Sequence, residues 1–194
     1  MSGIGRTALV GVALALGSVA LWSSVSVANE STRASLGDAL KVHARAQQPG
    51  DKPTFAEFNA AEHGMGGLRG ETTRLVGKEG ANSFFSTQDA VGNICLLVVN
   101  ERDGLTSSTC GPIDAVRAAG LPLKMTYLDD TTEVFLVPDG VTVDLPRSWD
   151  RVGENVLVVR DEKMVDMTAK AAFGDKDVIL KRFPAVDNTW APER

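Results

Sequence analysis

The fold is decided by a stretch that reads NICLLVVNERDGLTSSTC over residues 93–110. Its first part, residues 93–99, is apolar at almost every position, which is typical of a strand covered on both faces. Glu101-Arg102-Asp103-Gly104 has the composition of a type I turn with glycine last. Residues 105–110 then return as a second, more polar strand. The stretch therefore predicts a β-hairpin.

This hairpin contains both cysteines of the chain, Cys95 and Cys110. Residues that face each other across a simple hairpin have a constant sum of their numbers, and the two cysteines give the same sum as Arg102 and Asp103 at the turn. We therefore expect the cysteines opposite each other, with Cβ atoms about 4.5–5.5 Å apart, where a disulfide can form. A one-residue bulge at Gly104 would shift the pairing by one position and still leave the cysteines within reach.

Short strands and turns continue toward the C-terminus. The sequence predicts a helix over 113–119, strands over 123–128, 133–137, 141–145 and 178–183, and a hairpin of 155–160 with 164–168. Pro138, Asp139 and Gly140 lie in an x-P-D-G-x pattern that predicts a structural turn. Short strands at close spacing with few helices predict a mostly β fold, a small antiparallel sandwich or barrel with two or three short helices.

The chain begins with a largely apolar segment. Arg6 is the only charged residue before Glu30, and the apolar run over 8–22 gives way to small and polar residues that end at Ala28. This pattern predicts a secretory signal peptide over residues 1–28, cleaved after Ala28. An uncleaved membrane anchor is the alternative, because residues 7–29 are uncharged and long enough to cross a bilayer. Both alternatives place the remainder outside the cytoplasm, secreted or held on the outer face of the membrane, where disulfides persist.

The exported part is expected to be one domain on a flexible lead. Residues 29–53 have few large apolar side chains and include Gln47-Gln48-Pro49-Gly50, so they are expected to be a flexible tether. Residues 54–194 would form a single exported β-rich domain. It would open with a helix over 54–63, because Thr54-Phe55-Ala56-Glu57 has capping-box spacing. A second helical turn over 71–76 is expected before the strands begin.

Charge excludes two classes of partner. The chain has a formal net charge of −5 and no cluster of basic residues. Nucleic acids and anionic lipid surfaces both require such a cluster. We therefore expect no nucleic acid partner, and contact with a membrane only through the N-terminal segment if that segment is uncleaved.

Candidates for catalysis are few. Ser107 and Ser108 lie in the second strand of the hairpin, where hydroxyl side chains are common on a half-exposed face. A serine nucleophile requires a base. The only histidines are His43, in the expected tether, and His63, at the end of the first expected helix. No nucleophile elbow and no dinucleotide-binding loop is present, so we expect no catalytic residues, although a hydrolase with an unfamiliar site stays possible.

Metal ligands are also few. With both cysteines in one disulfide, two histidines cannot complete a zinc site. Asp129, Asp130 and Glu133 could hold calcium, but carboxylates are equally ordinary in turns. We expect neither a metal site nor any other cofactor.

Three segments together resemble a known group of proteins: Ile94-Cys95-Leu96-Leu97-Val98, Ser107-Ser108-Thr109-Cys110, and Phe135-Leu136-Val137-Pro138-Asp139-Gly140-Val141. The pattern resembles that of small exported actinobacterial proteins of unknown function. The resemblance implies that the cysteines and the Pro-Asp-Gly turn form one structural unit, but it implies no activity. The expected function is therefore that of a non-catalytic binding or accessory domain at the bacterial cell envelope, with an envelope protein or cell-surface ligand as partner. A membrane-tethered regulator or sensor is the alternative if the anchor is retained.

Overall fold

The structure, a computed structural model, describes residues 36–53, 67–127, 130–160 and 167–183. Its elements are η1 (Lys41–Ala44), η2 (Pro49–Asp51), β1 (Leu68–Glu79), β2 (Asn82–Asp89), β3 (Ile94–Asn100), β4 (Thr106–Gly111), α2 (Ile113–Ala119), β5 (Leu121–Tyr127), β6 (Asp130–Leu136), β7 (Thr142–Asp144), β8 (Trp149–Val152), β9 (Val156–Val159), β10 (Thr168–Phe173) and β11 (Lys176–Lys181). Strands account for 54% of the structure and helices for 14%, which confirms the predicted mostly β class.

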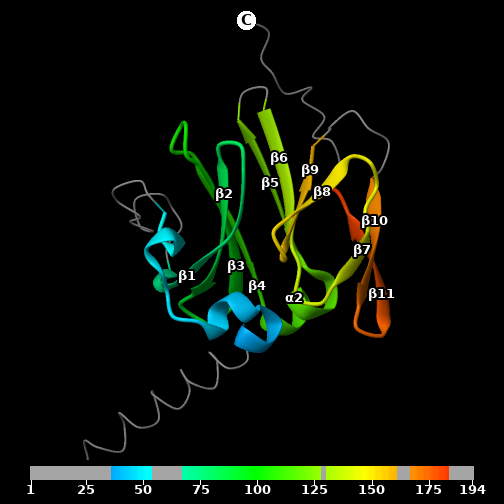
Figure 1. Ribbon diagram of the computed structural model, residues 1–194, viewed down its shortest axis with the longest axis horizontal. Coiled ribbons are helices and arrows are strands. Elements are labelled where there is room, and N and C mark those ends of the chain that lie inside the picture. Colours follow the sequence, from blue (N-terminus) through cyan, green and yellow to red (C-terminus); the bar gives the residue numbers. More distant parts are fainter. Residues whose placement is uncertain (1–35, 54–66, 128–129, 161–166, 184–194) are drawn as a thin grey trace, which may run out of the picture.

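The strands form three antiparallel sheets (Figure 1). The first has the order β1-β2-β3-β4, the second β5-β6-β9-β8 and the third β11-β10-β7. The predicted hairpin is β3 with β4, and its register places Cys95 directly opposite Cys110, without the shift that a bulge would have caused. The helix predicted over 113–119 is α2, with the same bounds.

Two apolar cores lie between the three sheets. The core between the first and second sheets contains alternate residues of β3, such as Leu96 and Val98, and residues of β6 and β9, such as Leu136 and Val156. The opposite face of the second sheet packs on the third sheet, where the Phe135 and Trp149 rings stack with their centroids 4.9 Å apart. The second sheet is therefore buried on both faces, which explains its continuous apolar strands.

The edges of the first and second sheets also meet. The turn between β8 and β9 brings Gly153 against β1, where a Cβ atom added to Gly153 would lie 2.6 Å from the Val76 carbonyl oxygen. Gly153 also has a φ of +69°, which side chains rarely adopt. Only glycine fits this close approach.

Two local predictions are wrong. Residues 71–76 belong to the long strand β1 and not to a helical turn. Residues 155–160 do not pair with 164–168, because β9 pairs with β6 and β8, and Thr168 begins β10, which pairs with β7 and β11. Residues 71–76 pair with β2, the next strand along the chain, whereas β9 and β10 each have one partner that lies farther away, β6 and β7. The helix predicted over 54–63 lies outside the described residues.

The expected tether is wrong over residues 36–53. Residues 36–39 are helical, and Leu36 and Leu40 are only 2% and 0% exposed in the first core. In Figure 1 this segment, in blue, lies at the foot of the sheets beside α2, and an Arg117–Asp38 ion pair of 4.0 Å joins the two. Residues 36–53 are therefore part of the domain. Among the described residues, no helix is long and apolar enough to cross a membrane.

Candidate functional site

The predicted disulfide is present between Cys95 and Cys110. Cys95 is fully buried, whereas Cys110 on β4 is exposed. The Asp89 carboxylate approaches both sulfur atoms, but two sulfurs bonded to each other are not free to ligate a metal ion. This group is therefore structural.

The predicted turn at Pro138-Asp139-Gly140 has a structural partner that the sequence did not indicate. Two hydrogen bonds join this turn to the N-terminal segment. The Lys41 N–H donates to an Asp139 carboxylate oxygen, and the Asp139 N–H donates to the Ala39 carbonyl oxygen. The other Asp139 carboxylate oxygen accepts a hydrogen bond of 3.0 Å from Asn155 Nδ2. Gly140 adopts a φ of +74°, as a turn with glycine requires. The turn therefore fastens residues 39–41 to the domain.

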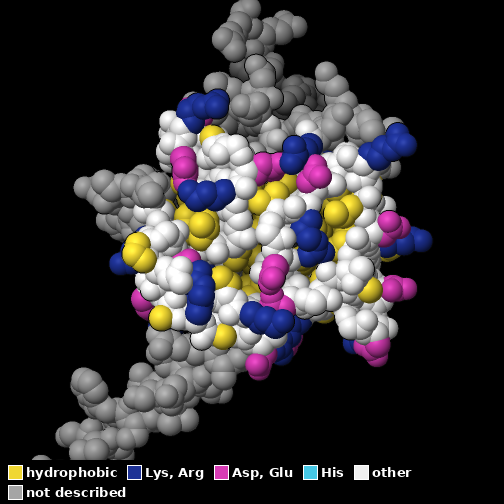
Figure 2. Space-filling view, viewed as in Figure 1, with side chains coloured by type: hydrophobic (Ala, Val, Ile, Leu, Met, Phe, Trp, Pro, Cys, Tyr) yellow, Lys and Arg dark blue, Asp and Glu magenta, His cyan; other side chains and the backbone are white. Residues whose placement is uncertain are grey.

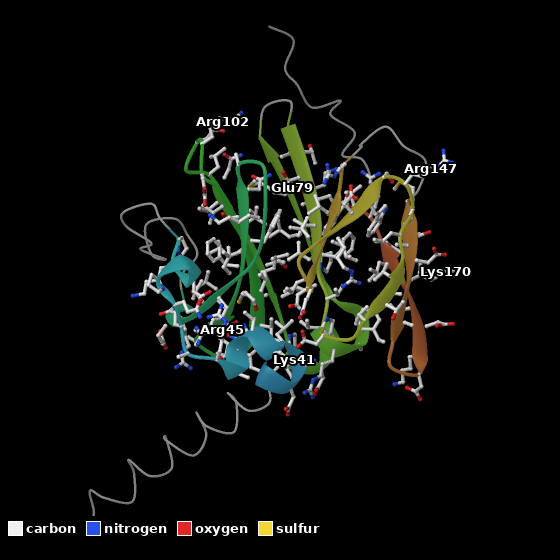
Figure 3. All side chains as sticks on the ribbon, in the orientation of Figure 1. Lys41, Arg45, Glu79, Arg102, Arg147 and Lys170 are labelled. Carbon is white, nitrogen blue, oxygen red and sulfur yellow. A yellow bond between two sulfur atoms is a disulfide. The ribbon has the colours of Figure 1, made fainter. Side chains whose placement is uncertain are left out.

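A polar cleft lies beside this N-terminal segment. Residues 43–47 form one side and β1 forms the other, with Glu71 and Arg74, and the cleft has a volume of about 540 Å³. Figure 3 shows Arg45 near the foot of the first sheet, far from Arg102 at the tip of the β3–β4 hairpin. Because the segment was expected to be a tether, this cleft was not predicted from the sequence.

Two guanidinium groups fix the shape of the cleft. Arg45 donates two hydrogen bonds to the Asp51 carboxylate, at 2.6 and 2.8 Å. Burial alone would raise the pKa of Asp51, but this pair and hydrogen bonds from the Gln48 and Leu75 N–H groups lower it to about 2. Arg74 is buried and donates to the Arg45, Glu71 and Thr73 carbonyl oxygens. These bonds join residues 45–51 to β1.

His43 lies at the inner side of the cleft. Its Nε2 atom is 3.0 Å from Ser86 Oγ on β2. Burial is the main reason that the pKa of His43 falls to about 4, and the charges of Arg74 and Arg45 lower it further. The imidazole is therefore neutral at ordinary pH. Among the described residues, this is the one hydrogen bond made by the His43 ring and by the Ser86 hydroxyl.

A small pocket opens at the base of the cleft. It has a volume of about 20 Å³ and is lined by Leu36, His43, Glu71, Thr72, Arg74 and Gln88. That volume holds about one water-sized group. Gln88 is 1% exposed, and its Nε2 atom donates a long hydrogen bond of 3.5 Å to the Gly92 carbonyl oxygen.

The other candidate residues lie elsewhere. Ser107 and Ser108 are half-buried on β4, opposite Val98 and Leu97. Glu133 is buried and forms an ion pair of 3.0 Å with Arg182, so it is not part of a calcium loop. His63 and Asp129 lie outside the described residues. The structure thus brings together His43, Ser86 and Gln88, a set that sequence spacing did not suggest.

Comparisons with protein-family models, with curated proteins and with solved structures found no match for this chain.

Proposed function

We propose that the protein is a non-catalytic binding domain that works outside the cytoplasm, at the bacterial cell envelope, and that the cleft between residues 43–47 and β1 is its binding site. In this proposal the sheets form a small sandwich or barrel that carries the site. The apolar N-terminal segment and the disulfide support export, because disulfides persist in oxidising compartments.

One observation carries the choice of site: the polar cleft shares His43, Glu71 and Arg74 with a small pocket that the buried Gln88 side chain also lines. Ligand sites combine a concave surface with a few fixed polar groups. Here Arg45 and Arg74 are held by the hydrogen bonds described above, and Gln88 is held within β2. Preorganised groups of this kind lower the entropic cost of binding.

The surface of the domain agrees with a protein or small-molecule partner. On the face shown in Figure 2, acidic and basic side chains of the described residues are interspersed, with apolar side chains between them. Such a surface gives no continuous basic field for a nucleic acid or an anionic membrane. The proposed partner is therefore an envelope protein or a cell-surface ligand.

A hydrolase is the second candidate, because His43 contacts Ser86. Two features count against this pair as nucleophile and base. Ser86 is 0% exposed, so a substrate carbonyl cannot approach its Oγ atom in this structure. Within the described part of the chain, no carboxylate bonds to the His43 ring to orient it, as a catalytic triad requires. We interpret the pair as structural support for the cleft.

Export is tested by sequencing the N-terminus of the protein recovered from its own cells. A mature chain that begins at Asn29 in the soluble exported fraction supports cleavage after Ala28. An N-terminus near Met1 in the membrane fraction would instead support the tethered regulator. Recovery of the protein in the cytoplasm with two reduced cysteines would contradict export altogether.

Binding at the cleft is tested by affinity purification of the full chain from its own cells, followed by mass spectrometry of what is retained. The Glu71→Lys variant reverses an exposed charge at the rim, and Glu154→Lys reverses one in the turn between β8 and β9. We expect Glu71→Lys to lose partners that the wild type and Glu154→Lys both retain. Identical sets of partners for all three proteins would contradict the assignment of the cleft.

A further inference from the structure

We propose that β11, the edge strand of the third sheet, pairs with β11 of a second copy of this chain, so that two three-stranded sheets join into one continuous sheet. This surface is separate from the cleft, and the inference does not depend on what the cleft binds. It is carried by the open backbone edge of β11, by the exposed side chains along it and by the match of their charges.

The backbone groups of β11 alternate between its two edges. The Arg182 N–H donates to the Met167 carbonyl oxygen at 2.9 Å, so these two residues form a hydrogen-bonded pair of the β10–β11 ladder. Such pairs alternate along an antiparallel ladder, so Val178 and Leu180 also bond toward β10. The residues between them therefore point their N–H and C=O groups away from β10: Asp177, Ile179 and Lys181.

These outward groups have no backbone partner among the described residues. β11 is the last strand of its sheet, and none of the backbone hydrogen bonds in the described part of the chain reaches its outer edge. The next outward N–H group is that of Phe183, and it already donates to Glu133 Oε1 at 2.7 Å. The open edge therefore runs from Asp177 to Lys181.

The chain itself covers the edges of the other two sheets. On β1, the Gln47 side chain bonds to the Gly70 and Thr73 carbonyl oxygens. The Leu75 N–H of the same strand donates to the Asp51 carboxylate. β4 lies against β5, and β8 lies against β1. An uncovered strand edge is a template for another strand, so β11 is the place where a second chain can add.

Exposed side chains lie along this open edge. Asp177, Ile179 and Lys181 alternate with the inward-facing residues of β11, so they share the solvent face of the sheet. Ile179 is 46% exposed although it is a large apolar residue, and Phe183, just beyond the strand, is 37% exposed. An exposed apolar side chain at the centre of an open strand favours pairing with another strand.

The charges fit an antiparallel pair of identical strands. Asp177 and Lys181 each lie two positions from Ile179, one on either side. When two copies of β11 pair antiparallel around Ile179, each Asp177 faces the partner's Lys181, and the two isoleucines meet at the centre. Each facing pair then exchanges two hydrogen bonds, and the opposite charges stabilise the pair. A parallel pairing in register would place like charges together. The antiparallel arrangement also has the two-fold symmetry of most protein dimers.

The test is sedimentation equilibrium of the full-length exported protein over a range of concentrations, where we expect the wild type to form a dimer. Lys181→Asp places aspartates opposite each other at both ends of the pair, so the dissociation constant should rise at least about tenfold. Arg102→Asp is the control, because it makes the same change of charge at the tip of the β3–β4 hairpin, far from the third sheet (Figure 3). It should dimerise as the wild type does. A wild type that stays monomeric at every concentration would overturn the inference.

A double variant, Asp177→Lys with Lys181→Asp, tests the register. It exchanges the two charges and restores opposite charges across the pair, so its dissociation constant should return close to that of the wild type. A folded double variant as weak as Lys181→Asp, or a Lys181→Asp variant as strong as the wild type, would contradict the proposed pairing.

Hydrogen exchange of the wild type tests the edge without any substitution. The amides of Asp177, Ile179 and Lys181 should exchange more slowly at high than at low protein concentration, whereas the Arg102 amide should not change. Equal exchange of the β11 amides at both concentrations would also overturn the inference.

Discussion

Acid should weaken the fold through His43, and the size of the effect follows from its two pKa values. In the unfolded chain the pKa of His43 has its ordinary value of 6.5, whereas burial lowers it to about 4 in the folded protein. Between these values only the unfolded chain binds the proton, so the free energy of unfolding falls as the pH falls. From about pH 7 to about pH 5 the loss from His43 amounts to about 2 kcal/mol. Asp51 does not contribute in this range, because its stabilisation is lost only below its ordinary value of 3.8.

The measurement is urea unfolding of the full chain, followed by far-UV circular dichroism at both pH values and the same ionic strength. The matched variant is His43→Gln, whose uncharged amide can still bond to Ser86 and does not titrate. We expect the pH-dependent loss of stability to be about 2 kcal/mol smaller in the variant than in the wild type. An equal loss in both proteins would refute the reasoning, because it would show that His43 is not buried as a neutral ring.

Three further perturbations concern the parts that hold the domain together. Joint replacement of Cys95 and Cys110 by alanine should lower the free energy of unfolding by about 3 kcal/mol, measured by urea unfolding; free-thiol labelling of the unfolded, unreduced wild type should detect no thiol. Gly140→Val should lower the free energy of unfolding by about 1 kcal/mol or more, because φ is positive at this position. Gly70→Val is the control and should lower it by less, because Gly70 has no positive φ and open space for a Cβ atom. Equal melting temperatures of the two variants would contradict this prediction. Asp139→Ala should lower the free energy of unfolding by about 2–4 kcal/mol, because it removes the bonds to Lys41 and Asn155. It should also accelerate hydrogen exchange of residues 36–44 more than that of β3. Uniform acceleration would show that the turn does not hold residues 36–44 on the domain.

The hairpin was predictable because its information is local. The turn at residues 101–104 sets the register of both strands, and the register sets the cysteine pairing, so short-range sequence is sufficient. The helix over 113–119 is local in the same way, since Gly120 ends it with an N–H bond to the Val116 carbonyl oxygen. β9 and β10 each pair with an adjacent strand, β8 and β11, but their other partners, β6 and β7, lie farther away in the chain, and periodicity contains no information about those pairings.

The N-terminal segment was misread for a related reason. Residues 36–53 contain few large apolar side chains besides Leu36 and Leu40, and Pro49-Gly50 is typical of a linker. Their burial results from packing on sheets formed by residues that come much later. The candidate site depends on the same packing, because His43 meets Ser86 and Gln88 only once the segment has docked. A polar residue such as Gln88, flanked by other polar residues, has no sequence signal that separates it from an exposed strand position.

The bond between Lys41 and Asp139 joins residues 98 positions apart, and this separation affects the order in which the molecule is completed. A chain is made from its N-terminus, so residues 36–45 emerge well before their docking surface on β6, β9 and the Asp139 turn. Contacts of such long range form slowly, because a large loop must close before they are gained. This early segment is therefore among the last parts of the domain to reach its native position.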